Sequence, residues 1–212
     1  MKAFIFDLDG VIVFTDKFHY QAWKKMADRM GIYFDETINN RLRGVSRAES
    51  LEIILEKYEG VSLTAEQKAE LMEEKNNTYR ELLKTMTAAD VTDQVRDTLK
   101  KLHEAGFKLA IGSSSKNAKF ILEKVELLDA FDAISDGNNI SKSKPDPEVF
   151  VKAAEYVDEQ VDKCLVVEDA KAGLQAAIAG GMDCAAIGDA VASGLGTYNL
   201  SAFADLLKVT AK

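Results

Sequence analysis

Hydrophobic and polar positions alternate differently in two parts of the chain. After about residue 86, short apolar runs alternate with stretches of helical periodicity; in order, these segments are 94–105, 108–112, 116–127, 131–135, 147–157, 164–167, 171–179 and 184–188. Alternating helices and apolar strands predict a parallel sheet covered by helices on both faces. The apolar segment 2–6 predicts one more strand, which we expect to join this later sheet because no other strand is near it.

The segment between residues 14 and 86 shows helical periodicity without strand signals. Thr15 can cap a first helix, in which Phe18, Ala22 and Met26 recur at helical spacing. Gly31 can end that helix. The fold class that we predict is α/β, with a core formed by residues 1–13 and 87–212 and an all-helical domain inserted over residues 14–86.

Composition limits the classes of function that the chain can have. Its 212 residues include 47% hydrophobic residues, 27 basic residues and 35 acidic residues, with a net charge of −8. An acidic surface repels a phosphate backbone, so we expect no nucleic-acid partner. Cys164 and Cys184 stand inside apolar runs, which favours core thiols over a disulfide or a metal site.

The chain shows no signal for a membrane. Its first residues, MKAFIFDLDG, lack the apolar region and cleavage site of a signal peptide. No uncharged apolar run reaches the roughly 18 residues that a membrane helix needs. We therefore expect a cytoplasmic protein, and a monomer, because no exposed apolar stripe requires a partner.

Acids, hydroxyls and one lysine follow the predicted strands. Ligands of open parallel sheets bind where the strands end, so these residues should converge on one edge. In chain order, they are Asp7, Asp9, Gly10, Ser113, Ser114, Ser115, Lys116, Asn117, Lys144, Glu168 and Asp169. Each of these residues could instead form a turn, cap a helix or be solvated. If the four loops only capped helices, however, they would not need to carry acids, hydroxyls and a lysine that complement one another.

This set of residues has a common chemical logic. Clustered carboxylates repel one another unless a cation lies among them, and hard oxygen ligands suit Mg²⁺. A lysine and a serine hydroxyl beside such a cation suit a phosphoryl group. The chain has no Walker-type loop and no kinase signature, which favours a nucleophile on the protein, such as Asp7. Asp9, two residues on, can act as a general acid and base.

Four segments resemble the motifs of the haloacid dehalogenase superfamily. They are FIFDLDGVI, IGSSSKN, SKSKPDPEVF and VVEDAKAG, and they occur in this order between residues 4 and 173. The resemblance implies a Rossmann-like α/β core with a helical cap inserted after the first motif.

The helical segment is similar to one group in that superfamily, the β-phosphoglucomutases. The similarity lies in LRGVSRAESL (42–51), HYQAWK (19–24) and EKNNTY (74–79). Members of this group interconvert β-glucose 1-phosphate and glucose 6-phosphate through glucose 1,6-bisphosphate and an aspartyl-phosphate enzyme. The resemblance therefore implies an Mg²⁺-dependent phosphomutase acting on a phosphosugar.

The resemblance also implies roles for the core residues. Asp7 would be the nucleophile and Asp9 the general acid and base. The Asp7 side chain, the Asp9 carbonyl, Glu168 and Asp169 would hold Mg²⁺. Ser113 and Lys144 would hold the transferring phosphoryl group.

Residues that would bind the rest of the substrate follow from the same resemblance. Arg47 would grip the second phosphate together with the core residues Ser115, Lys116 and Asn117. The predicted residues of the helical segment are Thr15 at the hinge, His19 and Lys75 near Asp9, Trp23, and Gly44, Val45 and Ser46 along the sugar. For Trp23, packing is favoured over a sugar platform, and for His19 and Lys75 simple solvation is the alternative.

Two alternatives and one departure from the family stay open. A sugar-phosphate phosphatase shares the four motifs but passes the phosphoryl group to water. A catalytically silent sugar-phosphate sensor is the second alternative. Phe14 stands where the family usually has an acidic residue before the threonine, and we expect it to change packing at the hinge.

Overall fold

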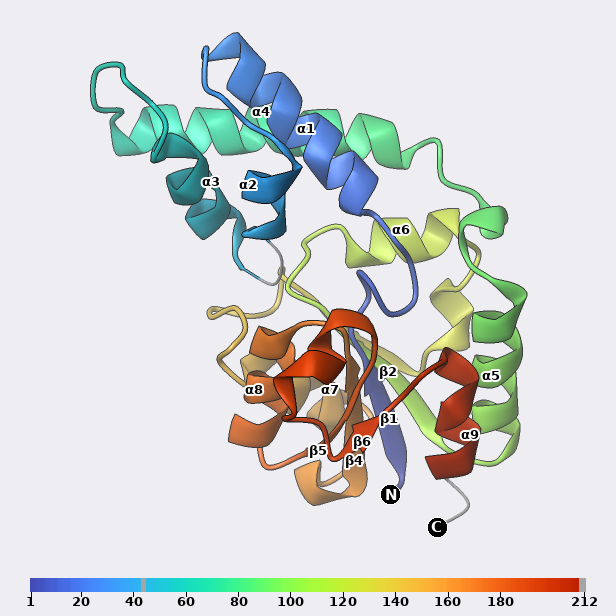
Figure 1. Ribbon diagram of the computed structural model, residues 1–212. Helices are drawn as coiled ribbons and strands as arrows, with labels where there is room; N and C mark the ends of the chain where they lie inside the picture. The colour runs from blue at the N-terminus through green and yellow to red at the C-terminus, as the bar shows by residue number, and fades with distance from the viewer. Residues whose placement is uncertain (43–44, 210–212) are drawn as a thin grey trace. The chain divides into compact units, whose positions relative to one another are not determined.

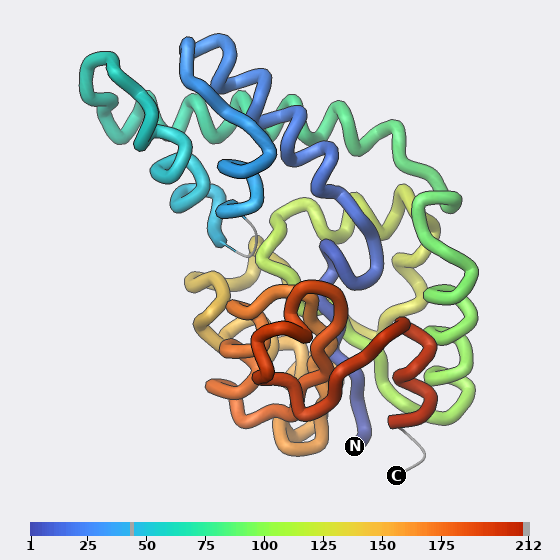
Figure 2. Tube along the Cα trace, viewed as in Figure 1, coloured from blue at the N-terminus to red at the C-terminus, as the bar shows by residue number. Residues whose placement is uncertain are grey.

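The computed structural model describes residues 1–42 and 45–209 and divides into two compact units. The core unit comprises Met1–Phe14 and Met86–Lys212, and the helical unit comprises Thr15–Thr85 (Figures 1 and 2). Gly44, one of the predicted sugar-binding residues, lies outside the described residues.

A single parallel sheet organises the core unit. Within the described residues it has six strands, in the order β3-β2-β1-β4-β5-β6. Their bounds are β1 Ala3–Phe6, β2 Lys108–Gly112, β3 Ala133–Ser135, β4 Cys164–Glu168, β5 Asp183–Ala186 and β6 Tyr198–Asn199. The central strand β1 pairs with β2 on one side and β4 on the other, so that Ile5 lies between Ala110 and Val166.

Helices cover both faces of this sheet (Figure 1). Their bounds are α5 Asp93–Glu104, α6 Ala118–Lys124, α7 Glu148–Tyr156, α8 Lys171–Ala179 and α9 Leu206–Val209, with short 3-10 turns η1 Ala88–Asp90, η2 Leu128–Ala130, η3 Val161–Lys163, η4 Gly188–Ser193 and η5 Phe203–Asp205. On one face, Ile5 belongs to the same core cluster as Phe150 of α7 and Leu174 of α8. On the other face, the Phe6 ring stacks on Phe203 at 5.7 Å between centroids. Successive residues of β1 therefore serve opposite faces, as a doubly covered strand requires.

The apolar pattern predicts most of the strands and α-helices of the core unit and misses two, β6 and α9. The predicted helix 171–179 has the observed bounds of α8, and the predicted strand 108–112 those of β2. The predicted helix 116–127 is too long, since α6 spans Ala118–Lys124. The strand β6 is missed because two residues, Tyr198 and Asn199, are too short to show a period of two.

The helical unit contains four α-helices among its described residues. They are α1 Asp16–Arg29, α2 Glu36–Asn40, α3 Arg47–Leu55 and α4 Ala65–Leu83. Trp23 of α1, Ile54 of α3 and Leu71 of α4 belong to one buried cluster. These apolar faces cover one another, so the unit has a hydrophobic core of its own.

Short polar side chains start three of these helices. The Asp35 side chain accepts a hydrogen bond from the Ile38 amide at α2. Ser46 and Thr64 form capping boxes at α3 and α4, with Glu49 and Gln67 as their partners. Thr15 is the N-cap residue of α1, as predicted, and its carbonyl accepts from the Phe18 and His19 amides, but its side chain makes no capping hydrogen bond.

No helix in the described part of the chain combines the length and the apolar character that crossing a membrane requires.

Candidate active site

Parallel neighbouring strands bring the predicted core residues to one edge of the sheet. Asp7 directly follows β1, Ser113 follows β2, and Glu168 is the last residue of β4. Because β2, β1 and β4 are adjacent, their carboxyl ends lie side by side. Lys144 comes from the loop between β3 and α7 and reaches the same edge.

Lys144 is the cation of this cluster. Its ammonium donates hydrogen bonds to Asp7 Oδ1 at 2.5 Å and to Glu168 Oε2 at 2.7 Å. The Lys144 side chain is only 5% exposed, and its Nζ lies 4.6 Å from the centre of the Phe150 ring. Burial alone would lower the pKa of Lys144, but the negative charges of Asp7 and Glu168 outweigh it and raise the pKa. The lysine is therefore a fixed positive charge at neutral pH.

Three carboxylates surround this lysine. Oxygen atoms of Asp7, Glu168 and Asp169 all lie within 4.8 Å of one another. Burial, followed by the charges of Asp7 and Glu168, raises the pKa of Asp169 to about 8. Burial and the charge of Asp7 also raise the pKa of Glu168. Three carboxylates facing one ammonium leave an excess of negative charge, so the donor set fits a divalent cation with a preference for oxygen ligands.

Two glycines leave the space that these carboxylates need. Gly10 has a φ of +88°, and a Cβ added to it would lie 2.0 Å from Asp169 Oδ2. A Cβ added to Gly173 in α8 would lie 2.0 Å from Glu168 Oε2. Both contacts are far shorter than a van der Waals separation, so a side chain at either position would displace an acidic residue.

A turn of serines follows β2. Ser113 Oγ accepts from the Ser115 amide at 3.2 Å, and Ser115 Oγ accepts from the Asn117 amide at 3.2 Å. Ser113 and Asn117 are buried, whereas Lys116 is exposed. Ser114 Oγ is buried without a hydrogen-bond partner among the described residues. Since Ser113 and Ser115 only accept in these bonds, their hydroxyl hydrogens can still be donated to a bound group.

The helical unit has a second buried lysine among the predicted residues. Lys75 is 3% exposed, so the alternative of a solvated lysine is wrong. Its Nζ lies 2.9 Å from His19 Nδ1 and within 5 Å of the ring centres of Trp23 and Tyr79, at 4.9 and 4.6 Å. Burial, then the charges of Lys75 and Arg47, hold the pKa of His19 well below its usual value of 6.5. His19 is therefore neutral at pH 7.

The remaining predicted residues of the helical unit have defined local partners. Trp23 is 2% exposed within the core of the unit, which agrees with the packing interpretation. Arg47 begins α3 and is half-buried, with Nη2 donating to Asn76 Oδ1 at 2.8 Å. Ser46 caps α3, and its hydroxyl accepts from the Glu49 amide at 3.2 Å. Val45 is half-buried and Thr15 is buried.

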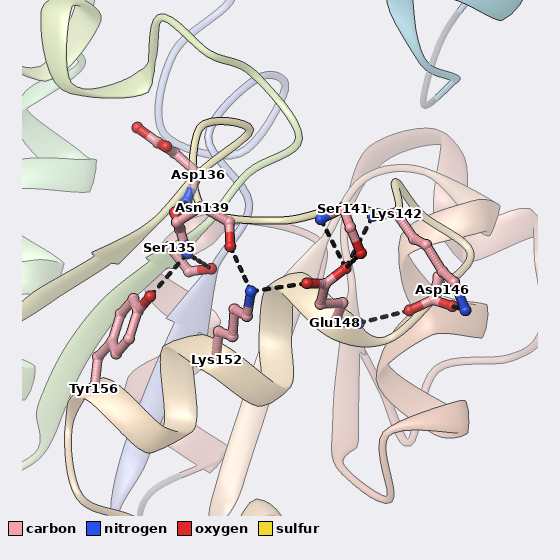
Figure 3. A network of polar contacts seen from close by, with 9 residues as sticks. All are labelled: Ser135, Asp136, Asn139, Ser141, Lys142, Asp146, Glu148, Lys152 and Tyr156. Carbon is pink, nitrogen blue, oxygen red and sulfur yellow. Dashed lines mark hydrogen bonds and ion pairs between the residues drawn. The ribbon is translucent and has the colours of Figure 1, made fainter.

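Sequence patterns did not indicate the side chains that hold the Lys144 loop. Glu148, Lys152, Asn139 and Tyr156 form a polar network around residues 135–148 (Figure 3). Glu148 stands inside the motif SKSKPDPEVF, so a signal was present, but only the lysine of that motif was given a role. Asn76 was missed in the same way, although it lies inside EKNNTY.

A cavity of about 500 Å³ in the helical unit is separate from these groups. It is lined by Gln21 and Lys25 of α1, by Asn77, Thr78, Glu81 and Leu82 of α4, and by Thr85. None of these residues belongs to the predicted site, so the polar cluster of the core unit remains the best candidate.

Comparisons with known proteins agree with the motif assignment. The family model described as haloacid dehalogenase-like hydrolase matches residues 1–181. A β-phosphoglucomutase from Bacillus subtilis is 41% identical over 194 residues, covering 89% of this chain and 84% of the relative. A phosphorylated carbohydrates phosphatase from Thermotoga maritima is 30% identical over 185 residues, covering 86% and 83%.

A solved structure matches along the entire chain. The crystal structure of a β-phosphoglucomutase from Clostridium difficile superposes with a TM-score of 0.92 at 34% identity, covering 100% of this chain and 96% of the other. This likeness confirms the predicted fold class, a Rossmann-like α/β core with a parallel sheet and an inserted helical cap domain.

Proposed function

Because the chain belongs to the haloacid dehalogenase-like hydrolase family, we propose that it is an Mg²⁺-dependent β-phosphoglucomutase. The reaction would interconvert β-D-glucose 1-phosphate and D-glucose 6-phosphate through glucose 1,6-bisphosphate and a phosphorylated Asp7. The observation that supports it most is the buried cluster in which Lys144 pairs with Asp7 and Glu168 beside Asp169. The 41% identity to the B. subtilis mutase supports the choice of reaction.

In this proposal Asp7, the Asp9 carbonyl, Glu168 and Asp169 bind the cation. Bound Mg²⁺ would neutralise the phosphoryl oxygens and the carboxylates that otherwise repel them. Lys144 supplies a fixed positive charge to the same oxygens, and Ser113 donates its hydroxyl to one of them.

Asp7 and Asp9 would perform the two transfers. In the first, the 6-hydroxyl of β-glucose 1-phosphate gives its proton to Asp9 and attacks the phosphorus of phospho-Asp7, so that the bond from phosphorus to Asp7 breaks and glucose 1,6-bisphosphate forms. In the second, an Asp7 oxygen forms a bond to the phosphorus of the 1-phosphate while the bond from that phosphorus to the sugar oxygen breaks, and Asp9 returns the proton to the leaving oxygen. Glucose 6-phosphate is then released and phospho-Asp7 is restored.

A mutase differs from a phosphatase in what attacks phospho-Asp7. We propose that Arg47 binds the non-reacting phosphate, together with Ser115, Lys116 and Asn117, and so favours a sugar hydroxyl over water. Arginine suits this role because its planar guanidinium can bind phosphate with two hydrogen bonds. Gly44, Val45 and Ser46 would line the sugar beside Arg47, with His19 and Lys75 near Asp9, Trp23 beside Lys75 and Thr15 at the hinge.

The direct test is an assay of the proposed reaction. The protein receives β-glucose 1-phosphate, Mg²⁺ and a trace of glucose 1,6-bisphosphate, and glucose 6-phosphate and inorganic phosphate are both measured. We expect glucose 6-phosphate to form with little free phosphate. Release of free phosphate in proportion to substrate lost would refute the mutase and support the phosphatase.

A phosphatase acting on sugar phosphates is the second candidate, favoured by the 30% identity to the T. maritima phosphatase. Arg47→Ala separates the two: it should reduce mutase turnover strongly, by about 100-fold for a lost charged phosphate contact, while sparing hydrolysis of a small aryl phosphate. Arg29→Ala is the matched control, because it removes a guanidinium of the helical unit that pairs with Glu74. Equal losses of both activities in Arg47→Ala would contradict the proposal that Arg47 binds the non-reacting phosphate.

A sensor without catalysis is disfavoured because it has no need of a nucleophile. Asp7→Asn tests this point, since it keeps the shape of the side chain and removes the attacking charge. Loss of turnover and of the covalent phosphoryl mass on the protein is expected. A variant with unchanged turnover would disprove the phosphoaspartate mechanism.

A further inference from the structure

The loop that delivers Lys144 has an anchor outside the carboxylate cluster. This loop follows β3 and leads to α7, which begins at Glu148. Ser141 and Lys142 are exposed, whereas Lys144 is 7% exposed. The chain therefore passes from the surface to the cluster within a few residues, and what fixes Ser141 and Lys142 also fixes where the Lys144 side chain starts.

Both oxygens of the Glu148 carboxylate are occupied (Figure 3). Oε2 accepts from the Ser141 amide at 2.9 Å, the Ser141 hydroxyl at 2.8 Å and the Lys142 amide at 2.8 Å. Oε1 accepts from Lys152 Nζ at 2.8 Å. The bonds from Lys152, Ser141 and Lys142 hold the pKa of Glu148 at about 2, so the group is a carboxylate at any working pH.

Lys152 extends this anchor to the start of the loop. Its Nζ also donates to the Asn139 carbonyl. The Asn139 side chain accepts from the Asp136 amide at 2.6 Å and donates to Tyr156 at 3.0 Å. Glu148, Lys152 and Tyr156 all belong to α7, so one helix holds the loop at several points (Figure 3).

The same helix also supports the ammonium that the loop delivers. Phe150 of α7 is fully buried in the sheet-facing core, and its ring centre lies 4.6 Å from Lys144 Nζ. The start of the Lys144 loop and the contact at the tip of the Lys144 side chain are thus fixed to one rigid element. Such support is what precise placement of a catalytic group requires.

We propose that Glu148 is a positioning residue, whose carboxylate fixes Ser141 and Lys142 and thereby holds Lys144 against Asp7 and Glu168. This proposal rests on the proposed function, in which Lys144 stabilises the transferring phosphoryl group. Displacement of a catalytic group by about 1 Å can cost about 100-fold in rate, so a side chain that touches no substrate can still control turnover.

Glu148→Gln tests the proposal with almost no change of shape. The carboxylate accepts on both oxygens, whereas the amide offers one oxygen and one NH₂ group. In either orientation the NH₂ group faces donors, either Lys152 Nζ or the Ser141 and Lys142 amides. The anchor must therefore break on one side.

Two readouts are measured on the full chain with saturating Mg²⁺. The first is kcat and KM for β-glucose 1-phosphate. The second is the rate at which a trace of an amine-reactive ester labels Lys144, determined by mass spectrometry. In Glu148→Gln we expect kcat to fall at least about tenfold with KM nearly unchanged, because Lys144 serves the transfer step and not the sugar. Labelling of Lys144 should become several-fold faster as its Nζ gains access to solvent.

Internal references and a matched variant exclude general loosening of the protein. Lys75, buried in the helical unit, should keep its slow labelling, and Lys163, half-exposed, its fast labelling. Asp205→Asn is the matched control, since Asp205 also accepts from two backbone amides, of Ser201 and Ala202, and from a lysine, Lys208. This control should change neither kcat nor the labelling of Lys144.

Lys152→Met gives a second route if Glu148→Gln folds poorly. It removes the partner of Glu148 Oε1 and of the Asn139 carbonyl, but leaves the bonds from Ser141 and Lys142. In Lys152→Met we expect a smaller fall in kcat and a smaller increase in the rate of Lys144 labelling than in Glu148→Gln.

The outcomes separate this proposal from the proposed function. A fall in kcat without faster labelling of Lys144, or faster labelling without a fall in kcat, overturns the positioning role, and so does a variant that behaves as the parent protein. A parent protein that turns over no phosphosugar refutes the proposed function instead. In that case faster labelling of Lys144 in Glu148→Gln still supports the anchor, and unchanged labelling still overturns it.

Discussion

Among the described residues, each unit of the molecule buries one lysine, and the groups in contact with the two lysines differ. In the core unit, Lys144 lies against the carboxylates of Asp7 and Glu168 at 2.5 and 2.7 Å. In the helical unit, Lys75 lies against the His19 ring nitrogen and over the rings of Trp23 and Tyr79. Lys144 thus contacts two carboxylates and the Phe150 ring, and the contacts of Lys75 include an imidazole nitrogen and two aromatic rings.

The different neighbours of Lys144 and Lys75 suit the two lysines to different roles. Around Lys144 the carboxylates outnumber the cation, so the site is incomplete electrostatically and suits a second cation and a phosphoryl group. The contacts of Lys75 with His19, Trp23 and Tyr79 suit a role in orienting the His19 side chain. Removing each lysine should therefore have effects of different size and kind.

The largest effect is expected for Lys144→Met. The variant keeps the length of the side chain but loses the fixed charge that stabilises the transferring oxygens, so kcat should fall by about 1000-fold. Steady-state kinetics with β-glucose 1-phosphate measures this change. Lys75→Met, in which a buried lysine is removed from the other unit, should lose at most about tenfold. Equal losses would break the distinction between the two lysines.

Stability in the absence of metal should distinguish the same two variants. Removing one partner of a buried ion pair typically costs about 3–5 kcal/mol, because the remaining charges lose their compensation. Thermal unfolding of Lys144→Met should therefore start lower in EDTA and recover more on addition of Mg²⁺ than the parent protein does. For Lys75→Met, the gain in Tm from Mg²⁺ should equal that of the parent.

Cation binding should depend on pH through Asp169. Burial and the charges of Asp7 and Glu168 raise its pKa from 3.8 to about 8 in the metal-free protein. Because a proton competes with the cation for this carboxylate, Mg²⁺ affinity should rise by up to about tenfold per pH unit as pH increases toward 8. Calorimetric titration with Mg²⁺ at several pH values measures the slope. Asp169→Asn should weaken binding and flatten the slope, and a steep slope in that variant would contradict the assignment.

Opposite effects of pH on the stability of the two units are the smallest expected difference. The raised pKa of Asp169 gives a contribution to metal-free stability that is present below pH 3.8 and is lost as pH rises toward about 8. The pKa of His19 is lowered from 6.5, first by burial and then by Lys75 and Arg47, so its contribution is present above pH 6.5 and is lost as pH falls below that value.

Hydrogen exchange at several pH values, corrected for the intrinsic rate, measures each unit separately. On acidification below about pH 6.5, peptides of α1 and α4 should lose protection with a slope of at most about 1.4 kcal/mol per pH unit, the limit for one proton. Metal-free peptides of β1 and β4 should gain protection. His19→Gln should abolish the first trend without altering the second, and a trend that survives in this variant would exclude His19 as its source.

Much of the fold could be predicted because its signals are local. The run 108–112 is short and continuously apolar after its first residue, as a strand covered on both faces requires, and 171–179 shows helical periodicity; they match β2 and α8. The set Asp7, Ser113, Glu168 and Asp169 was also accessible, because each residue stands just after a strand and parallel strands end at one edge. The ends of α6 and the existence of β6 could not be predicted from the sequence. The helical periodicity over 116–127 extends beyond both ends of α6, and the two residues of β6 are too few to show a pattern.

The sequence by itself determined the types of residue, their order and the strand ends at which they stand. Only the tertiary structure decided that Lys75 is buried against aromatic rings and that Glu148 anchors the loop of Lys144. The physical reason is that burial and side-chain hydrogen bonding depend on how helices and loops pack in space, which the hydrophobic pattern does not specify. The sequence alone does not show whether a lysine or glutamate side chain is solvated or held by neighbouring groups. For Lys75 and Glu148, the packing of α4 and α7 decides this.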